Sequence, residues 1–243
     1  SNEAIKYFRQ AIMIDENFSE AYNNLGVALK SRGDINGATE NFVKALDLDP
    51  SCSSSKHMLA AMRGELTSKA PREYVEPLFD RFAYDFDDHL TENLDYAIPQ
   101  VFADLISREL KGALLESALD LGCGTGLSGE FIRERCNFLA GIDVSRGMLE
   151  QARKKMIYDQ LSHADMFEYL KQKELDFDLF ICLDALVYIG DLYDLFELVK
   201  TKNKRSGYFG FSTEHREESG FRLEESGRYS HSKAYVERLC EML

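Results

Sequence analysis

The 243-residue chain lacks the features that mark membrane, secreted and disulfide-bonded proteins. It contains no run of about 18 apolar residues, and its first ten residues do not have the basic-then-apolar layout of a secretory signal. The five cysteines are scattered, with no C-x-x-C pair and no histidine at metal-ligand spacing, which argues against a disulfide framework or a zinc site. We therefore expect a soluble, cytoplasmic protein without a bound metal.

Positive charge is also scarce in this chain. The formal net charge is −13, and residues 71–120 hold 4 Lys/Arg against 12 Asp/Glu. An acidic surface repels a phosphate backbone, so neither nucleic acid nor a membrane surface is an expected partner. The same acidity also fits a solvated helical face that only aids solubility.

The first part of the chain is an internal repeat. Residues 4–18 align with residues 38–52 at a constant shift of 34, and a 34-residue period is the signature of the tetratricopeptide repeat, a pair of antiparallel helices. Tryptophan is absent, and Tyr22 stands where the repeat pattern usually has it. We expect residues 1–66 to contain half a repeat, one full repeat over 19–52 and a following helix.

This repeat segment predicts protein interaction. Stacked repeats usually need about three units, so we expect further repeats upstream of this sequence. The repeats are expected to hold a protein partner, with small and aromatic residues such as Ala38 and Phe42 in their core. We expect His57 to be a surface residue of the repeats.

A glycine-rich segment, LDLGCGTGLSGE at 119–130, predicts a nucleotide-cofactor site. An apolar strand leads into it, and its glycines let the backbone lie against a ligand. The spacing also satisfies the dinucleotide fingerprint, with Asp143 about 20 residues further on. Asp120 and Glu130, however, disfavour a pyrophosphate at the helix N-terminus and suit a cofactor that carries an ammonium and a sulfonium, such as S-adenosylmethionine.

Four segments in order strengthen this interpretation: the glycine loop, GIDVS at 141–145, ADMF at 164–167 and FDLFICLDALVYIGDL at 177–192. Together they resemble the motif series of class I S-adenosylmethionine-dependent methyltransferases, and of those that carry tetratricopeptide repeats. The resemblance implies that Asp143 accepts from the ribose hydroxyls, that Asp165 and Met166 lie at the adenine, and that Asp120 lies beside the methionine part. The cofactor-binding residues implied are Asp120, Gly122, Cys123, Gly124, Gly126, Asp143, Val144, Asp165, Met166 and Leu183.

Beyond the glycine loop, strands alternate with helices, which predicts an α/β, Rossmann-like, doubly wound and mainly parallel sheet. The expected strands are 138–144, 161–164, 177–184 and 207–213, and the expected helices are 146–156, 191–203 and 232–242. We expect a helical cap over the cofactor site at 67–113 and the methyltransferase domain at 114–243, with strand order 3-2-1-4-5. The family's last two strands are missing, so the domain is expected to be C-terminally truncated, with 207–213 as an exposed edge open to self-association.

The sequence identifies the methyl acceptor less well than the cofactor, because methyl transfer mainly requires alignment of the nucleophile, and a base only where the nucleophile starts protonated. We expect Asp184 and Tyr188 to face the transferred methyl group, and a hairpin at 220–232 to bring Tyr229 and His231 near the acceptor. The candidate catalytic residues are His89, Tyr188 and His231.

The expected function is methyl transfer from S-adenosylmethionine to a small-molecule or protein acceptor. Two alternatives stay open at this point. One is an NAD-dependent oxidoreductase that uses the same glycine loop. The other is an interaction protein whose repeats do the work and whose Rossmann-like domain is catalytically silent.

Overall fold

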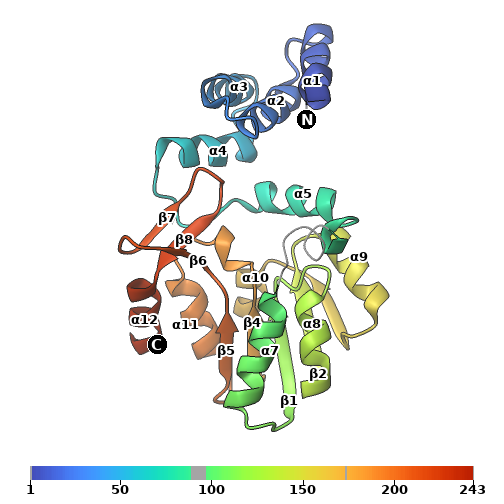
Figure 1. Cartoon of the computed structure of the whole chain (residues 1–243), viewed down its shortest axis with the longest axis vertical. Helices are drawn as coiled ribbons and strands as arrows, with labels where there is room; N and C mark the ends of the chain where they lie inside the picture. Colours follow the sequence, from blue (N-terminus) through green and yellow to red (C-terminus); the bar gives the residue numbers. More distant parts are fainter. Residues whose placement is uncertain (1, 89–96, 173, 243) are drawn as a thin grey trace. The chain divides into compact units, whose positions relative to one another are not determined.

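The computed structural model describes residues 2–88, 97–172 and 174–242, and the chain folds into two compact units (Figure 1). The first unit comprises residues 1–74 together with the short segment 222–228. The second comprises residues 75–221 and 229–243. None of the helices in the described part of the chain is long and apolar enough to cross a membrane.

The first unit is built on helical hairpins, as the 34-residue period predicts. Its helices are α1 (Asn2–Ile14), α2 (Ser19–Lys30), α3 (Ile35–Leu48) and α4 (Ser53–Arg63). The Asp34 side chain begins α3 by accepting a hydrogen bond from the Gly37 N–H at 3.0 Å. Phe42 is fully buried, and a Cβ atom on Gly26 would lie 2.8 Å from its ring. The absence of a side chain at Gly26 therefore lets α2 and α3 pack closely.

The prediction that His57 lies on the surface is wrong. His57 is 3% exposed, its Nε2 donates to the Gly227 carbonyl oxygen at 2.8 Å, and its ring centroid lies 4.5 Å from that of Tyr74. The repeat pattern contains no information about residues 222–228, which are 170 positions away in sequence yet belong to the same unit. A long-range contact therefore buries a residue that the repeat alone would expose.

The second unit contains a five-stranded parallel sheet, as the alternation of strands and helices predicts, in the order β3-β2-β1-β4-β5 that the family resemblance implies. The strands are β1 (Leu115–Leu121), β2 (Cys136–Asp143), β3 (Gln160–His163), β4 (Leu179–Cys182) and β5 (Tyr208–Phe211). The helices are α5 (Arg72–Phe82), which begins in the first unit, α7 (Ile98–Glu109), α8 (Leu127–Ile132), α9 (Arg146–Lys155), α10 (Met166–Gln172), α11 (Tyr193–Lys202) and α12 (Lys233–Met242). Short 3-10 helices occupy η1 (Arg133–Arg135) and η2 (Leu186–Tyr188).

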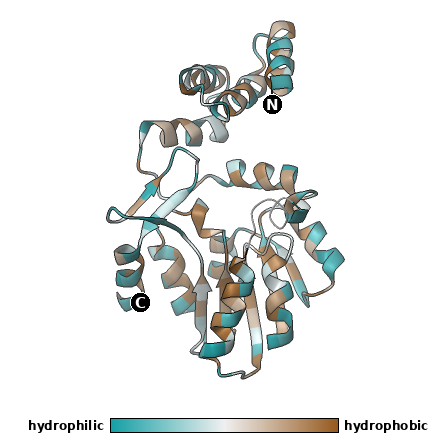
Figure 2. Ribbon diagram, viewed as in Figure 1, coloured by the Kyte–Doolittle hydropathy of each residue, from teal (hydrophilic) through white to brown (hydrophobic). Residues whose placement is uncertain are grey.

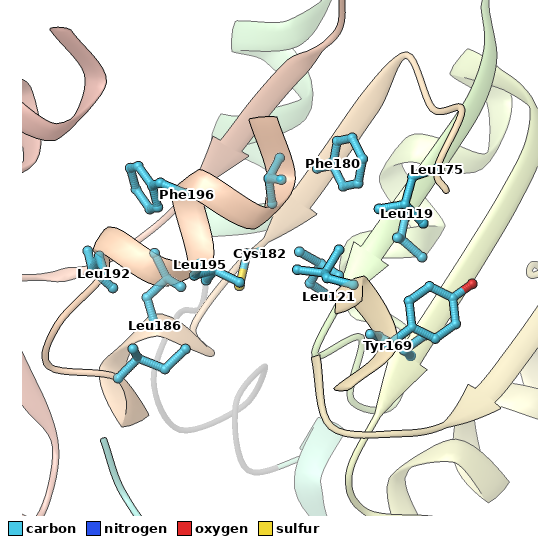
Figure 3. Close-up of a cluster of buried hydrophobic side chains, with 14 of the residues drawn as sticks. Leu119, Leu121, Tyr169, Leu175, Phe180, Cys182, Leu186, Leu192, Leu195 and Phe196 are labelled. Carbon is cyan, nitrogen blue, oxygen red and sulfur yellow. The ribbon is translucent and has the colours of Figure 1, made fainter. Parts of the chain in front are cut away.

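The core of this unit lies on both faces of the sheet. Successive strand residues point to opposite faces, so Leu119 and Leu121 pack with α10 and α11 whereas Ala118 packs with α7 and α8. Figure 3 shows the first of these clusters around Leu119, Leu121 and Phe180. The flanking helices carry both hydrophilic and hydrophobic residues (Figure 2), as expected for helices with one buried face.

Two elements were not expected from the sequence. Helix α10 forms after the third strand, where the Asp165 side chain accepts from the backbone N–H groups of Phe167 and Glu168 at 2.8 and 3.1 Å. Strand β6 (Glu214–Arg216) joins the predicted hairpin, β7 (Phe221–Leu223) and β8 (Tyr229–Ser232), in a second sheet of order β6-β8-β7. Both elements are shorter than eight residues, so a periodic pattern is difficult to recognise in them.

Candidate functional site

Asp143, the last residue of β2, forms hydrogen bonds to the loops that follow β1 and β2. One carboxylate oxygen of Asp143 accepts from the Gly124 N–H at 2.9 Å, and the other accepts from the Ser145 N–H at 2.7 Å. Asp143 is 8% exposed, and its burial raises its pKa to about 6. A single buried carboxyl group therefore holds the loop after β1 against the loop after β2, at the edge where open α/β sheets bind ligands.

The glycine loop supplies bare backbone at this edge. Gly124 has a φ of 54°, in the left-handed region, and a Cβ built on it meets no atom of the described residues within 4 Å. At Gly122, by contrast, a Cβ would lie 2.7 Å from the Cβ of Ala185, which follows β4. The loop thus packs against the end of β4 on one side, and the described residues leave open space beside Gly124. This is a surface on which a ligand can lie directly against the backbone.

Asp120 lies beneath this loop and is 1% exposed. Its Oδ2 accepts from the Tyr158 hydroxyl at 2.7 Å, whereas its Oδ1 has no hydrogen-bond partner in the described part of the chain. Burial is the main cause that raises the pKa of Asp120 to about 7, and the nearby Asp143 carboxylate adds to it. A buried carboxyl group with one unsatisfied oxygen is costly unless a cation or donor reaches it.

The remaining cofactor-site candidates lie on the loops around this edge. Val144 accepts from His163 Nε2 at 2.7 Å through its carbonyl oxygen, and Leu183 is buried in the core. Met166 opens α10, and its terminal methyl lies 3.8 Å from a Cβ position on Gly122. Asp165 caps α10, as described above, and Gly126 begins α8 with a φ of 92°. Cys123 is buried, and its burial raises the pKa of the thiol, which agrees with a packing role.

Residues 75–88 add acidic groups that sequence reasoning did not place in the site. The Oδ1 of Asp80 accepts from Ser145 Oγ at 2.6 Å and from the Gly147 N–H at 3.0 Å, so it caps the start of α9. Asp87 accepts from the Thr125 hydroxyl in the glycine loop and pairs with Lys155 Nζ at 2.8 Å. The sequence signals their acidity but not their targets, because the targets are more than 35 residues away.

The candidate catalytic residues occupy different environments. His89 lies outside the described residues. Tyr188 lies in η2, just after β4, and its ring meets that of Phe79 edge-on with centroids 5.4 Å apart. His231 is 1% exposed, with Nε2 bonded to the Gly190 carbonyl oxygen at 3.0 Å and Nδ1 bonded to the Thr213 hydroxyl. Burial lowers the pKa of His231 and favours its neutral form.

The hairpin at 220–232 forms as predicted, but Tyr229 does not project from it. Tyr229 is fully buried, and its ring carbons would lie 2.6 Å from a Cβ on Gly190. Asp184, also expected on the acceptor side, has a φ of 54°, which is uncommon for a non-glycine residue. Its N–H donates to Ser212 Oγ at 2.8 Å, which holds the turn after β4. Backbone strain of this kind is often concentrated at functional sites.

The hydrogen bond between Tyr158 and Asp120 gives a first prediction. We expect Tyr158→Phe to lower the free energy of unfolding by about 1 to 3 kcal/mol at pH 8, because the ionised Asp120 then loses its hydrogen-bond donor. Urea unfolding at pH 8 and pH 5 measures this, and the loss is expected to be smaller at pH 5, where Asp120 is protonated.

The matched control is Tyr193→Phe. The Tyr193 hydroxyl also bonds to a carboxylate, Glu197 at 3.2 Å, but on the helix surface. Its removal is expected to cost less than about 0.5 kcal/mol at either pH. Equal losses in the two variants would show that Tyr158 does not support a buried charge.

Comparisons with known proteins agree with this geometry. Residues 118–207 match the methyltransferase domain family, and residues 19–52 match the tetratricopeptide repeat family. An 18S rRNA (guanine-N(7))-methyltransferase of Bos taurus is 34% identical over 71 residues, covering 29% of this chain and 25% of the relative. A malonyl-[acyl-carrier protein] O-methyltransferase of Salmonella typhimurium is 28% identical over 142 residues, covering 58% of this chain and 54% of the relative.

The fold also matches solved structures. N-methyltransferase NodS from Bradyrhizobium japonicum, in complex with S-adenosyl-L-homocysteine, superposes with a TM-score of 0.54 at 18% identity, covering 68% of this chain and 84% of that one. The second unit therefore shares its Rossmann-like fold, with the sheet order β3-β2-β1-β4-β5, with that N-methyltransferase. The chain thus combines a region similar to the methyltransferase domain family, over 118–207, with a match to the tetratricopeptide repeat over 19–52.

Proposed function

We propose that the chain binds S-adenosylmethionine and transfers its methyl group to a small-molecule or protein acceptor. One observation carries this proposal: Asp143 ends β2 as a buried acid bonded to Gly124, whose backbone borders open space. A ribose needs an acceptor for its hydroxyls and a backbone surface beside it, and this pair of residues offers both. The chain spans only a quarter to about half of the length of the two curated relatives described above.

The site residues are proposed to divide the cofactor among them. Each oxygen of Asp143 accepts one backbone N–H and has a further lone pair for a ribose hydroxyl. The Asp165 and Met166 turn is proposed to hold the adenine. The unsatisfied Oδ1 of Asp120 is proposed to attract the ammonium of the methionine part, which would relieve the cost of a buried carboxylate. This last assignment gives the raised pKa of Asp120 a functional reason.

When bound, the cofactor would supply a methyl group that an acceptor atom takes in line, with the carbon–sulfur bond breaking and S-adenosylhomocysteine as the leaving group. The chain's own residues then have to align the acceptor and exclude water. Tyr188 and Asp184, which follow β4, are proposed to line the part of the site that binds the methyl acceptor. The hydrogen bond from the Asp184 N–H to Ser212 Oγ fixes the turn at Asp184. Both ring nitrogens of His231 are already hydrogen-bonded, to Thr213 and Gly190. We therefore propose that His231 positions the acceptor-binding residues through Gly190 and does not itself transfer a proton.

The comparisons leave the acceptor open, because one relative is named for ribosomal RNA and another for an acyl-carrier protein. The excess of acidic residues over 71–120 favours an acceptor other than RNA.

We propose that the repeats hold a protein partner. The outer strand β5, which pairs only with β4 among the described residues, is a candidate surface for self-association.

Calorimetric titration with S-adenosylhomocysteine tests the proposed cofactor, with NAD and NADP as parallel ligands. We expect a dissociation constant on the order of micromolar for S-adenosylhomocysteine and no binding of either dinucleotide. Binding of NAD alone would contradict the proposal. Transfer of a labelled methyl group from S-adenosylmethionine to acceptor fractions then separates an active enzyme from a domain that only binds the cofactor.

Asp143→Ala tests the ribose contact. We expect S-adenosylhomocysteine to bind about 2 kcal/mol more weakly, which is roughly 30-fold, because two hydroxyls lose a buried acceptor. Asp159→Ala is the matched control, since Asp159 also accepts a backbone N–H, from Leu139 at 2.7 Å, and is bonded to Arg133 rather than to the glycine loop. It is expected to lower stability but leave affinity within about threefold. Unchanged affinity in Asp143→Ala would remove Asp143 from the site.

A further inference from the structure

The tip of the β7–β8 hairpin, residues 222–228, is folded as part of the unit that contains the repeats. It is a tight turn in which the Gly227 N–H donates to the Glu224 carbonyl oxygen at 2.8 Å and the Glu224 N–H donates to the Arg228 carbonyl oxygen at 2.8 Å. Leu223 and Gly227 are buried, whereas Glu225 is exposed. The tip therefore presents one buried side and one acidic, exposed side.

The buried side of the tip fits α4 and the start of α5 closely. His57 Nε2 on α4 donates to the Gly227 carbonyl oxygen at 2.8 Å. A Cβ on Gly227 would lie 2.9 Å from the Tyr74 hydroxyl oxygen and 3.1 Å from the Met58 sulfur, and Gly227 has a φ of 89°. Both the backbone conformation and the available space therefore require glycine at this position.

The acidic side of the tip is matched by a basic residue of the repeats. Lys30, at the end of α2, is half-buried; burial lowers the pKa of its ammonium, and charge attraction from the Glu225 carboxylate partly opposes that shift. His57 and Tyr74 lie with ring centroids 4.5 Å apart beside the same segment. We call Lys30, His57, Met58 and Tyr74 the tip-binding surface.

We propose that the tip-binding surface is a protein-docking surface that the chain occupies with its own hairpin tip. Its chemistry selects an acidic turn that ends in glycine, because it provides a donor for a backbone carbonyl, a lysine for a carboxylate and no room for a side chain at the glycine. A partner protein that carries such a turn would have to displace residues 222–228. The tip thus acts as an internal competitor for one part of the repeats.

Tethering makes this competition effective even if the contact is weak. A segment linked to its own binding surface acts at an effective concentration on the order of millimolar. A partner present at micromolar concentration is then excluded unless it binds much more tightly or the tip is released. This inference concerns the repeats alone and does not depend on the proposed methyl transfer.

A labelled peptide of residues 219–230 tests the proposal against three full-length proteins. We expect wild type to bind the peptide weakly or not at all, because its own tip occupies the surface. Gly227→Val cannot seat its tip and is expected to bind the peptide at least about tenfold more tightly, measured by fluorescence anisotropy. Gly220→Val is the matched control, since Gly220 has a φ of 82° in the same hairpin but meets no atom within 4 Å of its Cβ position.

A charge exchange supplies the second measurement. Adding Lys30→Glu to Gly227→Val is expected to abolish binding of the native peptide, and a peptide carrying Glu225→Lys is expected to restore it. Equal binding by wild type and Gly227→Val, equal binding by the two glycine variants, or binding by neither would each overturn the proposal. Failure of the charge exchange to restore binding would overturn the assigned charge attraction between Lys30 and Glu225.

Discussion

Gly124→Val is expected to abolish S-adenosylhomocysteine binding, with a loss of at least about 100-fold, while the protein remains folded. The described residues leave the space beside Gly124 open, so a valine side chain would project into the volume proposed for the cofactor. The φ of 54° also becomes strained for a β-branched residue, at a cost of about 1 to 2 kcal/mol. Calorimetric titration measures the affinity, and urea unfolding measures the accompanying loss of stability.

Gly112→Val separates the loss of cofactor affinity from the loss of stability. Gly112 has a φ of 75°, meets no atom within 4 Å of its Cβ position and lies before β1, at the opposite end of that strand. We expect the same loss of stability in this variant but unchanged affinity. If both variants bind S-adenosylhomocysteine equally, the glycine loop does not approach the cofactor.

Asp120→Asn is expected to stabilise the protein increasingly as the pH rises from 5 to 8. Burial raises the pKa of Asp120 to about 7, above its ordinary value of 3.8. A carboxyl group with a raised pKa in the folded state contributes stability at low pH, and that stability is lost as the pH rises through the folded pKa. Wild type therefore loses on the order of 3 kcal/mol between pH 5 and pH 8, at about 1.4 kcal/mol per pH unit below the pKa.

The difference in the free energy of unfolding between wild type and Asp120→Asn isolates the contribution of Asp120. Burial also lowers the pKa values of His57 and His231, which makes the stability rise with pH below pH 6.5. Wild type and Asp120→Asn share this effect, so it cancels in the difference. The asparagine oxygen can still accept from the Tyr158 hydroxyl, so the hydrogen bond is kept. Urea unfolding at pH 5, 6, 7 and 8 gives the difference directly.

Asp159→Asn is the control for this series. Arg133 and the Leu139 N–H hold the pKa of Asp159 below its ordinary value, so its contribution is already complete at pH 5 and has no slope up to pH 8. If the free-energy difference between wild type and Asp120→Asn does not change from pH 5 to pH 8, Asp120 does not titrate in this range. If Asp120 attracts the cofactor's ammonium, the more stable Asp120→Asn protein should also bind S-adenosylhomocysteine about tenfold more weakly.

Much of the fold follows from local patterns. The 34-residue period predicts the helical hairpins, because each repeat carries the same packing residues, and the match over 19–52 confirms it. The alternation of strands with helices predicts the parallel sheet, and the resemblance to class I methyltransferases implies its order. The glycine motif and Asp143 follow two neighbouring strands, so their meeting at one edge is also predictable.

Other features depend on contacts that no local pattern encodes. Tyr158 lies in a loop and reaches Asp120 across 38 residues, and Asp80 caps α9 across 65 residues. The hairpin at 220–232 is recognisable from its turn residues, but its pattern does not show that His231 is buried by Gly190 and Thr213. Nor does it show that the tip covers His57.

The sequence by itself determined the fold classes of the two units and the positions of the glycine loop and its acids, since these depend on periodicity and on the conformational freedom of glycine within short segments. Only the tertiary structure decided which of those acids are buried, which keep an unsatisfied oxygen and which histidines are enclosed. Burial and hydrogen bonding are properties of residues brought together from distant parts of the chain, and they set the pKa of Asp120. The same tertiary contacts place residues 222–228 on the repeats, far from their neighbours in the sequence.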